Sequence, residues 1–133
     1  MNTNYTQNLI DHLYRTIKKC EETIQTCSAA QKEDALGIDA NNTCVKQCRE
    51  CIDVINQLLQ TASFYLTHTK ETDSIRLVND MIEKCNICIK NCNDIISSCD
   101  TISKRCNGMI ASCLNTFNDC IDACRKCAEH PDL

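Results

Sequence analysis

Cysteine recurs at seven-residue steps through the last third of the chain, and this spacing constrains the fold more than any other feature. A seven-residue step returns a side chain to the same stripe of an α-helix. In a helical bundle that stripe faces the core and usually carries leucine, so the pattern predicts helices whose buried stripe is lined with thiols. Seven cysteines obey the step: Cys85, Cys92, Cys99, Cys106, Cys113, Cys120 and Cys127.

Apolar residues at three- and four-residue spacing extend this helical prediction over nearly the whole chain. Only two Gly and one Pro occur among the 133 residues, which favours long helices with short connections. We predict a single domain over residues 1–133 with helices at about 3–31, 42–67, 74–99 and 103–129. Four helices of similar length predict an all-α fold, an antiparallel up-down-up-down four-helix bundle with a cysteine-lined core.

Stop and cap residues predict where the first two connections lie. They are a stop at Gly37, an N-cap at Asn41 or Asn42, and an N-cap at Thr72 or Asp73.

The third connection is harder to place because the heptad runs through it unbroken. Residues 100–103 include cap-type side chains, whereas Asn107-Gly108 is the stronger local turn signal. A turn at about 100–103 is favoured, because it gives four helices of similar length.

Charge and patterning exclude several classes of function. The net charge is −4 and no long basic block occurs, so a nucleic-acid partner is not expected. No apolar run approaches the length of a membrane span, so no membrane partner is expected. No secretory signal is visible at the start, which predicts a cytoplasmic protein with reduced thiols; an exported form whose signal has been removed is the alternative. No catalytic constellation is visible either, so an enzyme is not predicted.

The predicted topology gathers the thiols toward one end of the bundle. The C-terminal halves of the first and third helices meet the N-terminal halves of the second and fourth there. Cys120, Cys124 and Cys127 are expected to reach toward the opposite end instead. That end is expected to hold an aliphatic plug of Leu9, Leu13, Leu58, Leu59, Leu66, Val78, Met81 and Ile82.

The close cysteine pairs predict a metal-binding core. Pairs spaced i,i+3 or i,i+4 share a helix face with Cβ atoms about 5–6 Å apart. Soft thiolates select Cu(I), zinc or iron–sulfur clusters. Zinc prefers tetrahedral sites on flexible knuckles and iron–sulfur clusters usually hang on loops, so mid-helix thiols favour several Cu(I) ions, with a ceiling on the order of ten to fourteen per chain. All fourteen cysteines are predicted ligands: Cys20, Cys27, Cys44, Cys48, Cys51, Cys85, Cys88, Cys92, Cys99, Cys106, Cys113, Cys120, Cys124 and Cys127.

Four other side chains are weaker candidates for accessory ligands or for a point of metal access. His12, His68 and His130 are expected at the end toward which Cys120, Cys124 and Cys127 reach, although solvated or capping histidines are common. Met109 offers a thioether, although plain packing is the commoner role of a core methionine.

Two other functions remain open from the sequence. One is a zinc or mixed-metal buffer of metallothionein type. The other is a structural or redox-sensitive helical bundle without metal. Disulfides within one helix suit the bond geometry badly, whereas disulfides between helices can form on oxidation.

Three cysteine-rich motifs give the chain a resemblance to the bacterial copper storage proteins, which are cysteine-rich four-helix bundles. They are "CVKQCREC" (Cys44–Cys51), "CNICIKNC" (Cys85–Cys92) and "CIDACRKCAEH" (Cys120–His130). The resemblance implies Cu(I) bound by the core cysteines, storage rather than catalysis, association into homotetramers and, without an export signal, the cytosolic branch. The chain departs from the family's pattern in having "CDTISKRCNG" where a histidine-rich connection often precedes the last helix, and in carrying only two cysteines in its first helix.

Overall fold

The computed structural model describes residues 3–32, 38–99 and 103–133, with side chains described over 4–29, 42–98 and 108–133. This part of the chain forms four α-helices: α1 (Thr3–Lys32), α2 (Ile38–Leu66), α3 (Thr72–Cys99) and α4 (Ser103–Ala128). The predicted all-α four-helix bundle is therefore confirmed.

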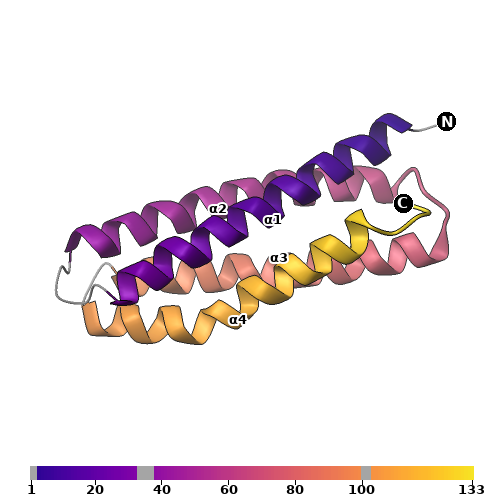
Figure 1. The fold of residues 1–133 in the computed structure, drawn as a ribbon. Coiled ribbons are helices and arrows are strands. Elements are labelled where there is room, and N and C mark those ends of the chain that lie inside the picture. Colours follow the sequence, from indigo (N-terminus) through magenta and orange to yellow (C-terminus); the bar gives the residue numbers. More distant parts are fainter. Residues whose placement is uncertain (1–2, 33–37, 100–102) are drawn as a thin grey trace.

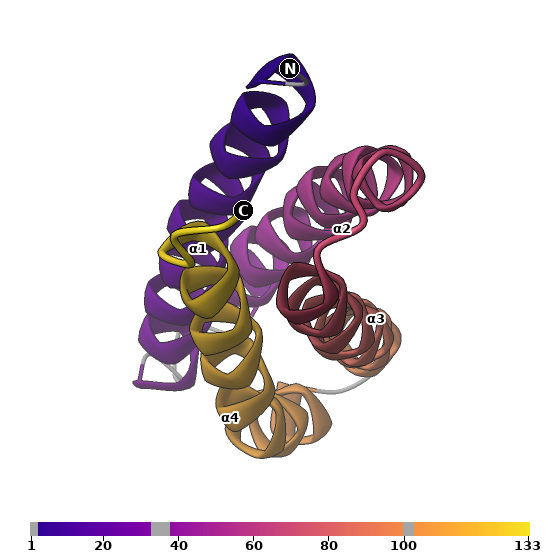
Figure 2. The same cartoon turned by 90° about the vertical axis from the view of Figure 1, so that its right-hand side faces the viewer.

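The helices run alternately up and down (Figure 1). The start of α1 and the end of α4 lie at the same end of the bundle as the α2–α3 connection. The end of α1, the start of α2, the end of α3 and the start of α4 lie at the opposite end. Viewed along the bundle, each helix lies beside two neighbours, with α1 between α2 and α4 and with α3 completing the ring (Figure 2). Side chains from all four helices therefore face one shared core.

Helix α2 begins earlier than the sequence predicted. It starts at Ile38, so Asn41 and Asn42 lie inside the helix and the expected N-cap at either residue is wrong. The predicted stop at Gly37 lies outside the described residues. The favoured turn at 100–103 is supported, because α3 ends at Cys99, α4 begins at Ser103 and Asn107-Gly108 lies within α4.

Helix α3 is capped by Glu71 rather than by Thr72 or Asp73, which lie in its first turn. The Glu71 carboxylate accepts hydrogen bonds from the backbone N–H groups of Asp73 at 3.1 Å and Ser74 at 3.3 Å. These bonds satisfy two of the donors that a helix start leaves unpaired, and they lower the pKa of the Glu71 carboxyl. The sequence prediction failed because Ser, Thr and Asp are the usual capping residues, whereas here a longer side chain reaches the same donors.

The end of the bundle that carries the chain termini contains the predicted aliphatic plug. Leu9, Leu13, Leu58, Val78 and Met81 are fully buried. Leu59, Leu66 and Ile82 are partly buried and pack against the same core.

Large aliphatic and aromatic side chains also interrupt the thiols. Phe117 in α4 is the largest fully buried side chain, and Ile55, Ile95 and Ile110 are fully buried with it. The core is therefore a packed interior of mixed thiols and hydrocarbon.

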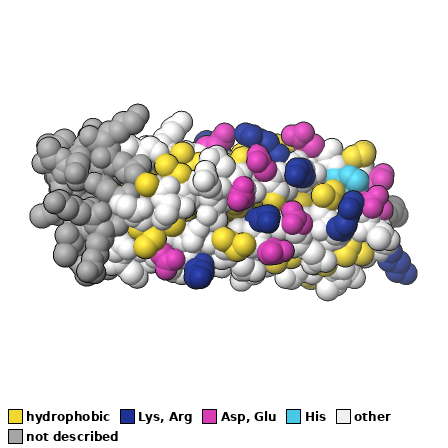
Figure 3. All heavy atoms as spheres, turned by 90° about the horizontal axis from the view of Figure 1, so that it is seen from below, with side chains coloured by type: hydrophobic (Ala, Val, Ile, Leu, Met, Phe, Trp, Pro, Cys, Tyr) yellow, Lys and Arg dark blue, Asp and Glu magenta, His cyan; other side chains and the backbone are white. Residues whose placement is uncertain are grey.

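The outer faces of the helices are charged and mixed in sign. Figure 3 shows basic and acidic side chains interspersed over one long face of the bundle. Ion pairs join neighbouring helices, with Lys19 Nζ 2.7 Å from Glu50 Oε1 and Arg125 Nη2 3.2 Å from Glu21 Oε2. Such surface pairs contribute at most about 1 kcal/mol each, so the stability of the bundle comes chiefly from its core. Within the described residues, no helix has both the length and the apolar character needed to span a bilayer.

Candidate metal centre

Every cysteine whose side chain is described is buried in the bundle core. These twelve are Cys20, Cys27, Cys44, Cys48, Cys51, Cys85, Cys88, Cys92, Cys113, Cys120, Cys124 and Cys127. The side chains of Cys99 and Cys106 lie outside the described residues. The heptad spacing thus correctly placed the thiols on the inner stripes of the helices.

Ten of these cysteines gather into four groups of three, and each group brings three Sγ atoms within 4.8 Å of one another. Three groups share one construction, in which an i,i+4 pair on one helix meets a single cysteine from the helix before it. The fourth group takes one cysteine from each of α1, α3 and α4. The groups are Cys27 with Cys44 and Cys48, Cys51 with Cys88 and Cys92, Cys85 with Cys120 and Cys124, and Cys20 with Cys88 and Cys120.

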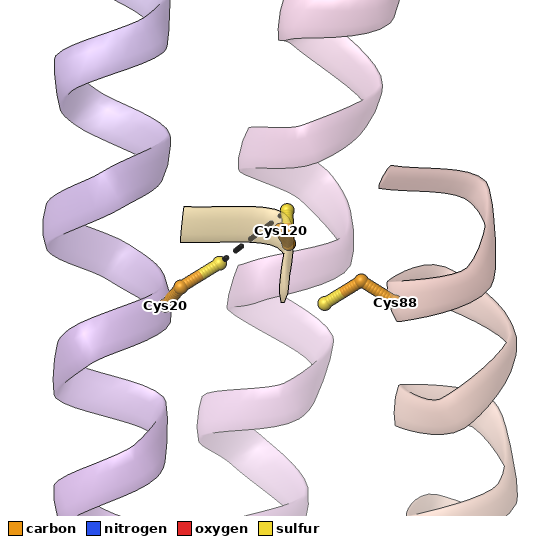
Figure 4. Close-up of side chains that lie close together, drawn as sticks. All are labelled: Cys20, Cys88 and Cys120. Carbon is orange, nitrogen blue, oxygen red and sulfur yellow. Dashed lines mark hydrogen bonds between the residues drawn. The ribbon is translucent and has the colours of Figure 1, made fainter. Parts of the chain in front are cut away.

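Two cysteines link three of the four groups into a continuous column, because Cys88 and Cys120 each belong to two of them. Figure 4 shows Cys20, Cys88 and Cys120 pointing toward one another from three helices. The Sγ atom of Cys120 lies 4.0 Å from that of Cys20 and 3.6 Å from that of Cys85. Cys20 is in turn 3.9 Å from Cys51, so sulfur neighbours sulfur across all four helices.

The expectation that Cys120 and Cys124 lie apart from the other thiols is wrong. Both join Cys85 in one group, and Cys120 is central to the column. Only Cys127 of this trio stands apart, since its Sγ atom lies 3.1 Å from the Leu77 carbonyl oxygen and it belongs to none of the four groups.

The predicted i,i+3 pairs do not serve as building units. None of the four groups contains Cys48 with Cys51, Cys85 with Cys88, or Cys124 with Cys127. In each case the two cysteines belong to different groups, or one of them belongs to none. Cysteines three positions apart on α2 and on α3 instead belong to different groups along the column.

A disulfide joins Cys27 of α1 to Cys44 of α2, with their Cα atoms 5.0 Å apart. It is the kind of link between helices that oxidation was expected to allow. The Cys48 Sγ atom lies 3.9 Å from that of Cys27. Reduction of the disulfide supplies the two thiols that this group needs as ligands.

Hydrogen bonds from neighbouring thiols make Cys120 an acceptor within the column. The thiols of Cys124, Cys20, Cys85 and Cys88 stabilise a thiolate at Cys120 and lower its pKa. The contact with Cys120 is also the main cause that raises the pKa of Cys20, Cys85, Cys88 and Cys124. Of the two shared cysteines, Cys120 therefore loses its proton before Cys88.

A second acceptor lies at Cys51, on the other side of Cys88. Hydrogen bonds from Cys20, Cys88 and Cys92 lower the pKa of the Cys51 thiol. Away from these acceptors, burial raises the pKa of Cys113 and raises that of Cys127 to about 12. Buried thiols are thus divided between a few acceptors and many protonated donors.

We expect the reduced, metal-free protein to lose stability as the pH rises above about 9. Thiols with a raised pKa in the folded state keep their protons in a range where the unfolded chain releases them. Unfolding is then favoured by about 1.4 kcal/mol per pH unit for each such thiol. Above pH 9 the two thiols with a lowered pKa are ionised in both the folded and the unfolded state, so only the raised thiols set the slope, which is negative. The contribution of Cys127 ends near pH 12, its pKa in the folded protein. Anaerobic urea denaturation at pH 8, 9, 10 and 11 measures this slope. A free energy of unfolding that stays flat or rises with pH would contradict the raised pKa of the buried thiols.

Methionine sulfur touches the column at a residue that the sequence assigned only to the aliphatic plug. The Cys85 thiol donates to Met81 Sδ at 3.5 Å, and both side chains are fully buried. Met81 is therefore the better thioether candidate. Met109, the sequence candidate, is partly buried, accepts a hydrogen bond from the Ser112 hydroxyl at 3.9 Å and belongs to none of the four groups.

The three histidines have different surroundings, and none of them belongs to a thiol group. His12 is partly buried, and burial together with Arg15 lowers its pKa. His68 is exposed, stacks on Tyr5 with ring centroids 4.1 Å apart, and directs Nδ1 at the Phe64 carbonyl oxygen.

His130 lies with Glu71 and Asp132, one potential ligand atom from each falling within 4.8 Å of the other two. Sequence reasoning missed both carboxylates, because nothing in the local pattern links the start of the third helix to residues that follow the fourth.

The buried thiol groups can hold metal ions, since each presents soft ligands at contact distances. Comparison of the chain with protein-family profiles, with curated proteins and with solved structures finds no match in any of the three.

Proposed function

We propose that this protein stores Cu(I), binding several ions through the cysteine thiolates of its core. The observation that carries the proposal is the set of four buried groups of three sulfurs, three of which are joined through Cys88 and Cys120. Neighbouring groups that share a ligand suit ions bridged by common thiolates. The resemblance of the cysteine motifs to copper storage proteins supports the same function.

The ligand arrangement favours Cu(I) over zinc. A structural zinc site takes four ligands in a tetrahedron. The groups here offer three sulfurs each, drawn from rigid helices, and no histidine joins them. Cu(I) is a soft ion that thiolates select strongly. Two or three thiolates around one such ion need no rearrangement of the helices.

Charge balance explains how the core can hold so many ions. Each bound ion replaces thiol protons, because the ligand is the thiolate. A bare thiolate inside a packed core is costly, whereas a thiolate paired with a monovalent cation is close to neutral. Binding of Cu(I) is therefore coupled to the release of thiol protons. A column of buried thiols drawn from four helices fits storage or detoxification better than catalysis.

Metal content after expression distinguishes this function from a zinc buffer. Protein purified anaerobically from cells supplied with both copper and zinc is expected to carry several copper ions and little zinc. Elemental analysis of the pure protein measures both. Zinc at about one ion per four thiols, with little copper, would instead support the metallothionein-like alternative. Protein that retains neither copper nor zinc would support the structural, redox-sensitive bundle.

The cytoplasmic location and the homotetramer that the resemblance implies belong to the same proposal. Light scattering of the reduced protein tests the assembly, and a monomer at all concentrations rejects it.

A further inference from the structure

A second cluster of potential ligands lies at the end of the bundle that carries the chain termini. Glu71 precedes α3, while His130 and Asp132 follow α4. One nitrogen or oxygen atom from each lies within 4.8 Å of the other two. The cluster contains no sulfur, so its chemistry differs from that of the thiol column.

The His130 ring supplies the observation that points to a ligand. Its Nε2 atom is shielded from solvent and has no hydrogen-bond partner. It faces the Glu71 carboxylate, with Nε2 3.7 Å from Oε2, which is too long for a hydrogen bond. A shielded imidazole nitrogen normally finds a partner, and this one is aimed at a carboxylate that it does not reach.

The backbone that carries His130 and Asp132 is held by hydrogen bonds from α1, α2 and α3. The Ser74 hydroxyl donates to the Asp132 carbonyl oxygen at 3.2 Å. Thr6 and Tyr65 both donate their hydroxyls to the Leu133 carbonyl oxygen, at 3.1 and 3.0 Å. The segment after α4 is therefore fastened across the ends of α1, α2 and α3, which sets His130 and Asp132 opposite Glu71.

We propose that Glu71, His130 and Asp132 bind one divalent cation, separate from the thiol-bound cargo. One imidazole and two carboxylates suit ions that take nitrogen and oxygen ligands, such as Mn²⁺, Fe²⁺ or Zn²⁺, and disfavour Cu(I). A bound cation would tie the segment after α4 to the start of α3 and close this end of the bundle more firmly.

Manganese is the appropriate probe, because buried thiols compete poorly for it. The experiment titrates Mn²⁺ into the full, reduced protein at pH 7 and follows the signal of free Mn²⁺ by electron paramagnetic resonance. One ion per chain is expected. His130→Gln and Asp132→Asn should each weaken binding at least about tenfold, whereas the matched controls His68→Gln and Asp119→Asn should leave it unchanged.

Thermal unfolding provides the second measurement. Mn²⁺ should raise the melting temperature of the wild-type protein and of both controls, and this gain should vanish in His130→Gln and Asp132→Asn. The proposal is overturned if no Mn²⁺ binds, or if binding survives both substitutions with unchanged affinity. Neither result bears on Cu(I) storage, because the thiol column is intact in all four variants.

Discussion

Replacing Cys88 and Cys120 together with valine will lower the Cu(I) capacity by more than the loss of two thiols out of fourteen accounts for, because ions bridged by these two cysteines lose a common ligand. Three of the four described groups contain one or both of these cysteines, and only Cys27, Cys44 and Cys48 keep a complete set. Valine is apolar and of similar size, so packing should be nearly preserved. Anaerobic titration with Cu(I) against a competing chelator measures the capacity of variant and wild type.

The double variant Cys113→Val, Cys127→Val is the matched control. It also removes two buried cysteines, but neither belongs to any of the four groups. We expect it to keep most of its capacity, and circular dichroism should show both variants helical. Equal losses in the two variants would mean that capacity depends on the number of thiols rather than on the shared positions.

The second large effect concerns stability. Phe117→Ala should lower the free energy of unfolding of the reduced, metal-free protein by about 3–5 kcal/mol, because the side chain is fully buried between Cys113 and Cys120 along α4. Rigid helices cannot collapse onto the space that the ring leaves. Urea denaturation monitored by circular dichroism gives the difference.

Phe64→Ala is the control for this prediction. Phe64 is 53% exposed and packs on the rings of Tyr5 and His68. Its loss should cost about 1 kcal/mol, the value of exposed aromatic contacts. Similar costs for the two phenylalanines would contradict the placement of Phe117 in the core.

The sequence was sufficient to predict the helices and their buried stripes. In a chain with only two glycines, a seven-residue cysteine spacing predicts helices that bury their cysteines on one stripe. Every cysteine whose side chain is described is buried, as this predicts. The turn near 100–103 was also predictable, because equal helix lengths decided between two local signals. These features depend on periodicity along one chain segment, which the sequence contains in full.

The partners of each thiol across helices could not be predicted in the same way. They depend on the stagger of neighbouring helices along the bundle axis, and a shift of one turn, about 5.4 Å, exchanges the partners. Cys120 was therefore placed away from Cys20 and Cys85, although it lies within 4.0 Å of both. Met81 was assigned only to hydrocarbon packing for the same reason, since nothing local shows that its sulfur meets Cys85.

Stagger also decides which residues gather at the ends of the bundle. Glu71 and His130 are brought together by the full length of two helices, and an error of one turn in either would separate them. Capping by Glu71 is likewise a matter of side-chain reach rather than of residue class.

The most direct test of the central claim is an anaerobic titration of the fully reduced wild-type protein with Cu(I) in the presence of a competing chelator. We predict that the protein takes several ions per chain before the chelator does, approaching a ceiling on the order of ten to fourteen set by its thiols. Saturation at zero or one ion per chain would contradict it.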